Sequence, residues 1–338
     1  MNNSDNNFYN KPFSYIYVEE AACEYEQTQD ILAKFPNATV IPIKHYKDIF
    51  NRKNQDTVAQ KHSMQLILAV ERENFLYPGA TVCQDFGNKH FYYTSLMMNC
   101  VYDCEYCYLQ GMYPSGNINI FVNTEDYFDD IRALLKKHPV SLSISYDTDM
   151  TALNGITGLV EEWYKLAMEE SELTIEIRTK CGATNLFDRL SPIPNLVFAF
   201  TISPSYVADK FEHNASDYES RKKALYKCLE SGFTTRLSLD PVLPIADFES
   251  IYTEMVDDIF SNTSTSLLKD ISIGSFRISK DYIKQMQDVR INHITTYPYS
   301  INDGICGFDK DTAEHIIKIM KDSILKYVSE DKLFIADN

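Results

Sequence analysis

No stretch of the sequence approaches the roughly 20 uninterrupted apolar residues that a membrane-spanning helix needs. The first residues, MNNSDNNFYNKPF, also lack the basic segment and the apolar segment of a secretion signal. These two absences predict a soluble, cytoplasmic protein with no membrane partner. In that reducing compartment the eight cysteines of the chain are expected to be ligands or reactive thiols rather than disulfides.

Positive charge is scarce, because 32 Lys and Arg face 48 Asp and Glu and the net charge is −16. Nonspecific binding to nucleic acid depends on Lys and Arg that neutralise phosphates, so this balance argues against a broad nucleic-acid-binding surface. It leaves room for a local basic groove. The chain also lacks internal repeats and low-complexity linkers, and its 338 residues suffice for one large domain or two ordinary ones.

The N-terminal part of the chain has the pattern of a small α/β unit, over residues 14–71. Strands are predicted in SYIYVEEA, ATVIPIK and MQLILAVE, and a helix in CEYEQTQDILAKF. The polar segment 45–63 carries scattered Lys, Arg and His, and we expect it to lie on the surface. We therefore predict an N-terminal α/β, Rossmann-like domain over residues 1–88.

From residue 89 onward, strand-like and helical patterns alternate. The strand-like runs are HFYYTSLM, VSLSISYD, LTIEIRTK, NLVFAFTIS, TTRLSLDPVL and LLKDISIGSF, and segment 204–217 is predicted to be mostly loop. Such alternation favours a parallel sheet with right-handed crossovers, as an open sheet or partial barrel over residues 89–310. A helix and a tail over 311–338 complete the chain. Active-site residues in such folds collect at the C-terminal ends of the strands.

Three cysteines lie close together directly after the first of these strands, in NCVYDCEYCYLQGMYPS, residues 99–115. Cys100, Cys104 and Cys107 have the spacing CxxxCxxC, which lets one loop surround a single metal centre. On a four-iron cluster, three thiolates leave one iron free to bind another molecule. A structural zinc site is the alternative, but zinc sites normally use two cysteine pairs and no second pair occurs here. Spacing and position favour iron–sulfur.

The CxxxCxxC motif after the first strand of a six-stranded βα array resembles the radical S-adenosylmethionine superfamily. Within it, CEYCYL, the later FVN and the N-terminal α/β unit are similar to the spore photoproduct lyase family, over roughly residues 14–330. This resemblance implies a partial (βα)6 TIM-like barrel of radical SAM type. It also implies a [4Fe–4S] cluster on Cys100, Cys104 and Cys107, whose open iron chelates S-adenosyl-L-methionine and whose electron cleaves it to a 5′-deoxyadenosyl radical.

The resemblance further implies cofactor-binding residues at the ends of three strands. Thr148 and Asp149, in SYDTD, match positions that contact the cofactor, although an ordinary turn uses the same residue types. Lys180 would face the methionine carboxylate, and Ser203 matches a serine near the cofactor. For both, a solvated side chain at a strand end is the plainer alternative.

The resemblance assigns radical chemistry to residues around the cluster. Tyr106 and Tyr108 match tyrosines that return a radical toward the cofactor, with packing around the cluster as the alternative. Tyr146 stands where much of the family has the cysteine that donates hydrogen to the substrate radical, and a phenol is a poorer hydrogen source there. Cys83 is the first candidate to replace that donor and Cys181 the second, unless each is simply a small buried hydrophobe.

A second departure from the family lies near the C-terminus. A basic, aromatic hairpin that contacts DNA is replaced by NDGICGF, residues 302–308, in which Gly304 and Gly307 keep a hairpin plausible. Together with the net charge, the missing Arg and Lys weaken the case for duplex DNA. A lesion must still be extruded and its phosphates held. Four cationic residues are candidates for that groove: Arg178, Arg236, Arg277 and Lys280.

Three function hypotheses follow from these residues. The resemblance implies a radical SAM carbon–carbon lyase that repairs the methylene-bridged thymine dimer in DNA, with an electron donor such as flavodoxin or ferredoxin. The two departures favour a related radical enzyme acting on another, nucleotide-like substrate. A non-catalytic iron–sulfur protein is the third hypothesis, and the set of cofactor-binding residues at the strand ends argues against it.

Overall fold

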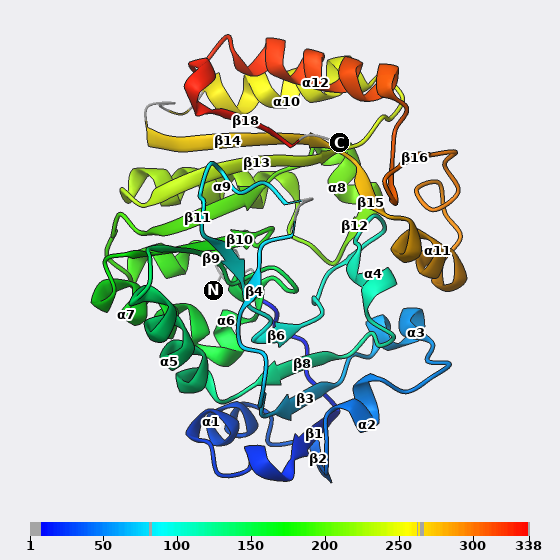
Figure 1. Ribbon diagram of the computed structural model, residues 1–338. Coiled ribbons are helices and arrows are strands. Elements are labelled where there is room, and N and C mark those ends of the chain that lie inside the picture. Colours follow the sequence, from blue (N-terminus) through cyan, green and yellow to red (C-terminus); the bar gives the residue numbers. More distant parts are fainter. Residues whose placement is uncertain (1–7, 81–82, 262, 264–266, 337–338) are drawn as a thin grey trace, which may run out of the picture.

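The structure, a computed structural model, describes residues 8–80, 83–261, 263 and 267–336. In this part of the chain, two large sheets lie one above the other and helices cover their outer faces (Figure 1). No helix in these ranges is long and apolar enough to cross a membrane.

The N-terminal sheet has the strand order β2-β1-β3-β8-β6. Its strands are β1 (Tyr15–Glu19), β2 (Thr39–Ile43), β3 (Leu66–Ala69), β6 (Met97–Met98) and β8 (Ile118–Phe121). The first three strands and helix α1 (Glu26–Lys34) confirm the predicted α/β pattern. β3 and β8 are buried at every position, as expected for apolar parallel strands covered on both faces.

Strand β8 belongs to this first sheet although it follows the cysteine loop in the sequence. The sheet thus includes residues on both sides of position 88, and the division into domains at 88 and 310 remains a prediction. Two short helices, α2 (Lys47–Phe50) and α3 (Thr57–His62), occupy the polar segment before β3.

The second sheet has eight strands in the order β18-β14-β13-β11-β10-β9-β5-β4, curled as half a barrel. From β5 to β18 all neighbours are parallel, and β4 joins the edge antiparallel. Its strands are β4 (Tyr77–Pro78), β5 (Phe91–Tyr93), β9 (Val140–Ser143), β10 (Leu173–Thr179), β11 (Leu196–Thr201), β13 (Thr234–Val242), β14 (Leu268–Ser275) and β18 (Leu333–Ala336). Five of the six predicted strands are confirmed as single strands, and the mixed α/β fold with them. The sixth, HFYYTSLM, divides into β5 in this sheet and β6 in the N-terminal sheet, so the cysteine loop follows β6.

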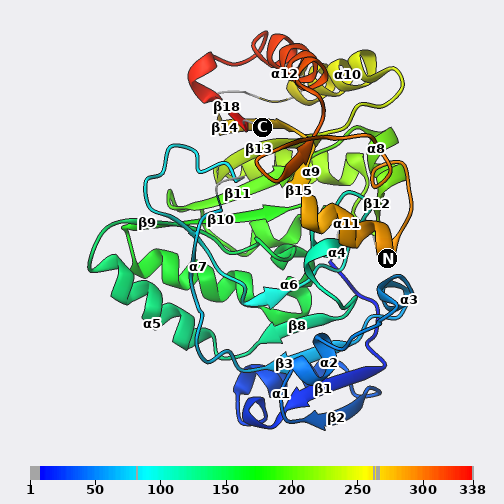
Figure 2. The same cartoon turned by 45° about the vertical axis from the view of Figure 1, so that its right-hand side comes forward.

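Amphipathic helices cover the outer face of this half-barrel, as Figure 2 shows from a second side. They are α5 (Thr124–Leu135), α7 (Leu159–Glu169), α9 (Tyr218–Glu230), α10 (Phe248–Ser261) and α12 (Lys310–Ile324). Helix α6 (Met150–Thr157) is buried almost throughout, because it packs between β10 and α1. In α12 the buried residues Ala313, Ile316 and Met320 recur every three or four positions, so one face packs on α10 and β14.

Two elements correct the sequence prediction. Segment 204–217 was expected to be mostly loop, yet it contains helix α8 (Ser205–Phe211), which buries Val207, Ala208 and Phe211. Its single apolar turn is too short for a clear helical period. The second correction is β18, where a tail was expected: after α12 the chain returns to pair with β14 in parallel.

Candidate functional site

The three-cysteine loop is held at both ends and in its middle. Asn99, at φ 73°, donates from its amide to Ser115 O at 2.7 Å and to Asn117 O at 3.0 Å, which closes the loop. In the middle, β7 (Asp103–Cys104) pairs antiparallel with β12 (Glu212–His213), the two-residue strand after α8. Helix α4 (Leu109–Met112) follows the last cysteine. The loop is therefore held by contacts with the rest of the protein.

The cysteine thiols lie in a setting that keeps them protonated until a metal displaces the proton. Cys104 is buried and Cys100 and Cys107 are half-buried. Burial, and then the nearby Asp149 carboxylate, raise the pKa of Cys100 to about 12. Burial also raises the pKa of Cys107, against the opposing charges of Lys180 and Lys61. Binding of a metal to these thiols must therefore release protons.

The donor set fits an iron–sulfur cluster better than a single ion. Within the described ranges, no three His, Cys, Asp or Glu side chains are grouped so that they could hold one metal ion. A [4Fe–4S] cluster makes a different demand, because each thiolate ligates a different iron and the three sulfur atoms stay apart. The three soft thiol donors on this loop can supply one ligand to each of three irons.

A buried glutamate brings three of the predicted site residues together. Glu212 is fully buried and accepts hydrogen bonds from Tyr106 OH and, at 2.9 Å, from Ser203 Oγ. Its Oε1 lies 4.0 Å from Lys180 Nζ, and its Oε2 lies 2.5 Å from Nη2 of the buried Arg221. Burial opposes ionisation, but the two cations hold the pKa of Glu212 below its usual range. Sequence analysis missed Glu212 because it lies in a segment expected to be loop.

The end of β9 combines a capping carboxylate with hydroxyls that have no partner. Asp149 is the N-cap of α6 and accepts from Ala152 N at 3.0 Å, Lys180 N at 2.7 Å and Thr179 Oγ1 at 2.8 Å. Thr148 Oγ1 and Ser145 Oγ are buried and find no hydrogen-bond partner among the described residues. These two hydroxyls are therefore available to a ligand at the end of β9.

Tyr108 points away from the Glu212 cluster and toward the end of β9. Its hydroxyl donates to Tyr146 O at 2.6 Å, and its ring lies 5.9 Å from the Tyr146 ring between centroids. Tyr106, by contrast, points to Glu212, and Lys180 Nζ lies 5.4 Å from the centre of its ring. The two tyrosines that flank Cys107 thus serve different sides of the site.

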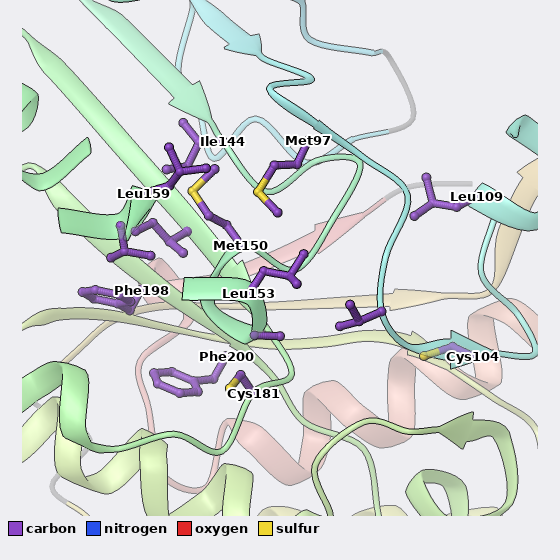
Figure 3. Close-up of a cluster of buried hydrophobic side chains, with 14 of the residues drawn as sticks. Met97, Cys104, Leu109, Ile144, Met150, Leu153, Leu159, Cys181, Phe198 and Phe200 are labelled. Carbon is purple, nitrogen blue, oxygen red and sulfur yellow. The ribbon is translucent and has the colours of Figure 1, made fainter. Parts of the chain in front are cut away.

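Cys83 meets the tyrosine that replaces the expected cysteine. Its Sγ donates a hydrogen bond to Tyr146 OH at 3.4 Å, and the Tyr146 ring stacks on Tyr93 with centroids 4.0 Å apart. Burial raises the pKa of Cys83, opposed by the Tyr146 contact and by Arg178, so the group is a neutral thiol near pH 7. Cys181 is only 1% exposed and lies beside Phe200 in the apolar core (Figure 3).

The arginines considered for a phosphate-binding groove have internal partners. Arg178 pairs with Glu176 at 3.1 Å, and Arg236 is bonded to both Glu176 and Asp270. Arg277 donates to both carboxylate oxygens of Asp240, at 3.0 and 3.1 Å. The positive charge of these three side chains is therefore largely neutralised by neighbouring carboxylates. Lys280, the fourth candidate, is exposed at the start of helix α11 (Lys280–Val289).

The C-terminal hairpin forms as the glycine pattern predicted. β16 (Ser300–Asn302) and β17 (Ile305–Gly307) pair antiparallel, and β17 also pairs with β15 (Arg277–Ser279). The two turn residues, Asp303 and Gly304, have φ of 47° and 81°, as a tight hairpin turn requires.

A loop with three thiols beside the ends of β9 and β10 fits the iron–sulfur class of enzymes. A family model described as spore photoproduct lyase matches residues 12–332. The chain therefore belongs to the spore photoproduct lyase family and is a radical S-adenosylmethionine lyase.

Solved structures of spore photoproduct lyase share this fold. A cysteine-to-alanine mutant matches with a TM-score of 0.81 and 18% identity over 97% of this chain and 99% of that chain. A complex with dinucleoside spore photoproduct has a TM-score of 0.80 and 18% identity over the same shares. A double mutant with bound AdoMet and dinucleoside spore photoproduct has a TM-score of 0.79, also at 18% identity and with the same shares. No curated protein sequence matches the chain.

Proposed function

We propose that this radical SAM lyase repairs the methylene-bridged thymine dimer and that Cys83 is its hydrogen donor. The observation that carries the proposal is the contact between Cys83 Sγ and Tyr146 OH. The position that lacks the family's usual thiol is thus served by a thiol from another segment, 63 residues away in sequence.

The cluster would be held by Cys100, Cys104 and Cys107 in a partial barrel of radical SAM type. When bound and reduced, the cluster supplies the electron that cleaves S-adenosylmethionine and so generates a 5′-deoxyadenosyl radical. Its thiolate ligands require reduced cysteines, which supports a cytoplasmic location.

The residues at the strand ends would bind and orient the cofactor in different ways. Thr148 Oγ1, buried and without a partner, would bind it directly, and Lys180 would supply the compact charge for its carboxylate. Asp149 and Ser203 already make hydrogen bonds inside the protein. We therefore assign Asp149 to holding the Lys180 backbone and Ser203 to holding Glu212.

The hydrogen-transfer step balances on residues of this chain. The Cys83 thiol gives a hydrogen atom to the allylic thymine radical, which completes the restored base and leaves a thiyl radical. The Tyr146 hydroxyl, in contact with that sulfur, can return a hydrogen atom and become a phenoxyl radical. The Tyr108 ring lies 5.9 Å from the Tyr146 ring between centroids, so Tyr108 would return a hydrogen atom to the Tyr146 phenoxyl radical. The Tyr108 phenoxyl radical would recover its own hydrogen atom from 5′-deoxyadenosine, which completes the balance. Tyr106, predicted as a second relay tyrosine, is bonded to Glu212 on the other side of the site.

A second candidate substrate is a lesion outside duplex DNA, such as a free or single-stranded nucleotide. The paired charges of Arg178, Arg236 and Arg277 favour it, because phosphate binding to duplex DNA needs available cations. The hairpin residues 302–308, with one Asp and no Arg or Lys, favour it as well.

The test is an anaerobic assay of the reconstituted enzyme with dithionite as the reductant. The spore photoproduct is supplied as a dinucleotide, within a single strand and within a duplex, and repaired thymine is measured beside 5′-deoxyadenosine. Repair of the dinucleotide supports the lyase, and faster repair of the single strand than of the duplex supports the second substrate form. Deoxyadenosine formed without repair of any substrate would overturn the proposal.

A further inference from the structure

A small cavity of about 20 Å³ lies beside the cysteine loop. Two proposed cluster ligands, Cys100 and Cys107, line it. Helix α3 contributes three residues to its wall: Thr57, Val58 and Lys61. The end of α11 contributes Val289 and Arg290. The cavity therefore lies where a cluster would receive electrons.

Both helices are tied to the cysteine loop itself. Lys61 Nζ donates to Cys100 O and to Asn99 Oδ1, the latter at 3.1 Å. Arg290 Nη2 donates to Asp103 Oδ2 at 2.7 Å, between the first two cysteines. A partner that touched α3 and α11 would therefore touch elements fastened to the cluster ligands.

Helix α11 is also seated against α4, the helix that follows the last cysteine. A Cβ atom built at Gly111 would lie 2.3 Å from Tyr282 O, so the two backbones meet where only glycine fits. The loop, α4 and α11 thus form one packed unit, and α11 lies on the same side of the molecule as α3 (Figure 1).

The segments that carry these helices are positive in an acidic protein. We call residues 44–62 and 280–293 together the cationic face. The first segment has five Lys and Arg against two Asp, and the second has three against two, whereas the whole chain has a net charge of −16. Lys61 and Arg290 bond to the cysteine loop, so the second segment is balanced towards a partner. The excess positive charge lies at four exposed residues of the first segment: Lys44, Lys47, Arg52 and Lys53. Ile291, 80% exposed, follows directly after Arg290 at the cavity wall. A single exposed apolar residue is common on protein surfaces, so Ile291 serves here as a position at which a substitution probes contact with a partner.

We propose that the cationic face is the docking surface for a small acidic protein that delivers single electrons to the cluster. The inference rests on the proposed function, because only a cluster at Cys100 and Cys107 needs electrons at this cavity. The partner's redox group, a flavin or an iron–sulfur centre, loses one electron and the cluster gains it. Opposite charges speed such encounters and make them sensitive to salt.

A nucleic acid is the other ligand that a positive surface attracts. The cavity favours the electron donor, since the cluster ligands line it, and the exposed Ile291 offers nothing to a phosphate. Reduction by flavodoxin and binding of lesion DNA, measured on the same variants, distinguish these two ligands.

The test compares a protein reductant with a chemical one. The face variants are Lys53→Glu with Lys284→Glu, and Ile291→Asp; all three positions are exposed. The matched control is Lys318→Glu with Lys326→Glu, the same charge change at exposed positions on and just after α12. Reduction of the cluster by reduced flavodoxin is followed by stopped-flow absorbance, and deoxyadenosine formation is measured with flavodoxin and with dithionite.

With flavodoxin, the face variants are expected to reduce the cluster at least about tenfold more slowly, with a weaker salt dependence for the charge reversal. With dithionite they should match the unchanged chain, and the control should match it with both reductants. Flavodoxin reduction at the normal rate in the face variants would overturn the docking surface. Normal reduction with weakened binding of lesion DNA would instead assign the face to nucleic acid. Failure of the unchanged chain with dithionite would overturn the proposed function itself.

Discussion

At the scale of single residues, the proposal depends on one contact between Cys83 and Tyr146. Tyr146 occupies the strand end expected to hold a thiol, and Cys83 Sγ contacts its hydroxyl. Strand β5 pairs with β4 on one side and with β9 on the other. The segment that joins β4 to β5 and contains Cys83 therefore begins and ends at the sheet edge beside β9. The proposed donor thiol thus comes from another part of the sequence but lies near the same strand end.

We expect Cys83→Ala to abolish repair of the photoproduct dinucleotide and to leave formation of 5′-deoxyadenosine intact. The thiol acts only after the substrate radical exists, so the cofactor steps do not need it. Both products are measured in one anaerobic assay by mass spectrometry. Cys181→Ala is the matched control and should repair normally; loss of repair in that variant alone would transfer the donor role to Cys181.

The protonation of Cys83 gives a pH test. Only the protonated thiol can donate a hydrogen atom, and burial raises the pKa of Cys83 above its usual range. Repair should therefore persist as the pH rises past about 8.5, the pKa of a free cysteine, and decline only at higher pH. The repair rate is divided by the deoxyadenosine rate at each pH, to remove effects on earlier steps. A decline centred below 8.5 would contradict a buried donor.

Glu212 is the residue on which the interior charges of the site depend. Replacing it by Gln leaves Arg221 buried without its anion, and breaking a buried pair in this way costs about 3–5 kcal/mol. We expect Glu212→Gln to lower the free energy of unfolding by that order, measured by urea denaturation. Asp258→Asn is the control, because its partner Lys222 forms a partly exposed pair worth under about 1 kcal/mol.

The charged form of Glu212 also sets the sign of a pH effect on stability. Because its folded pKa lies below the usual range, its contribution is present near neutral pH and is lost as the pH falls through the folded pKa. The loss of stability on acidification should be smaller in Glu212→Gln, and urea denaturation at neutral and acidic pH measures it. An equal loss in both proteins would show that Glu212 does not carry this charge.

At the scale of elements, short pieces of structure position the cysteine loop, and these were the hardest to predict. Five of the eight strands of the half-barrel were predicted as single strands because apolar runs mark them, such as the fully buried β11. Helix α8 and the two-residue strand β12 have no such pattern, yet β12 pairs with the loop and places Glu212 in the site. Such contacts depend on residues distant in sequence.

The contact between α4 and α11 gives a prediction at this scale. Gly111→Ala places a methyl group against the backbone of Tyr282, which cannot move without displacing α11. We expect a loss of about 1–3 kcal/mol in the free energy of unfolding and slower reduction of the cluster by flavodoxin. Gly155→Ala in α6 is the control, since its methyl group meets only the movable Phe8 side chain, at 3.3 Å. Equal stability of the two variants would show that the helices are not rigidly joined.

At the scale of the whole molecule, the sequence was most informative where ligands are neighbours on one loop. The motif of Cys100, Cys104 and Cys107 pointed to the family, and the family model over residues 12–332 confirms that membership. The partners of Arg178, Arg236 and Arg277 could not be predicted, because each carboxylate pairing depends on strand register and side-chain direction. The net charge of the chain could not predict a positive face, because it does not show how the charges are distributed over the surface.

The central claim is that this radical enzyme restores thymines and that a thiol completes the reaction. The most direct measurement runs the anaerobic reaction in deuterated water, where thiol hydrogens exchange with the solvent, with the photoproduct dinucleotide as substrate. From the unchanged enzyme we expect restored dinucleotide that carries a single deuterium. From the Cys83→Ala variant we expect no restored dinucleotide. 5′-Deoxyadenosine formed while the photoproduct stays intact would contradict the claim and show that this enzyme acts on another substrate.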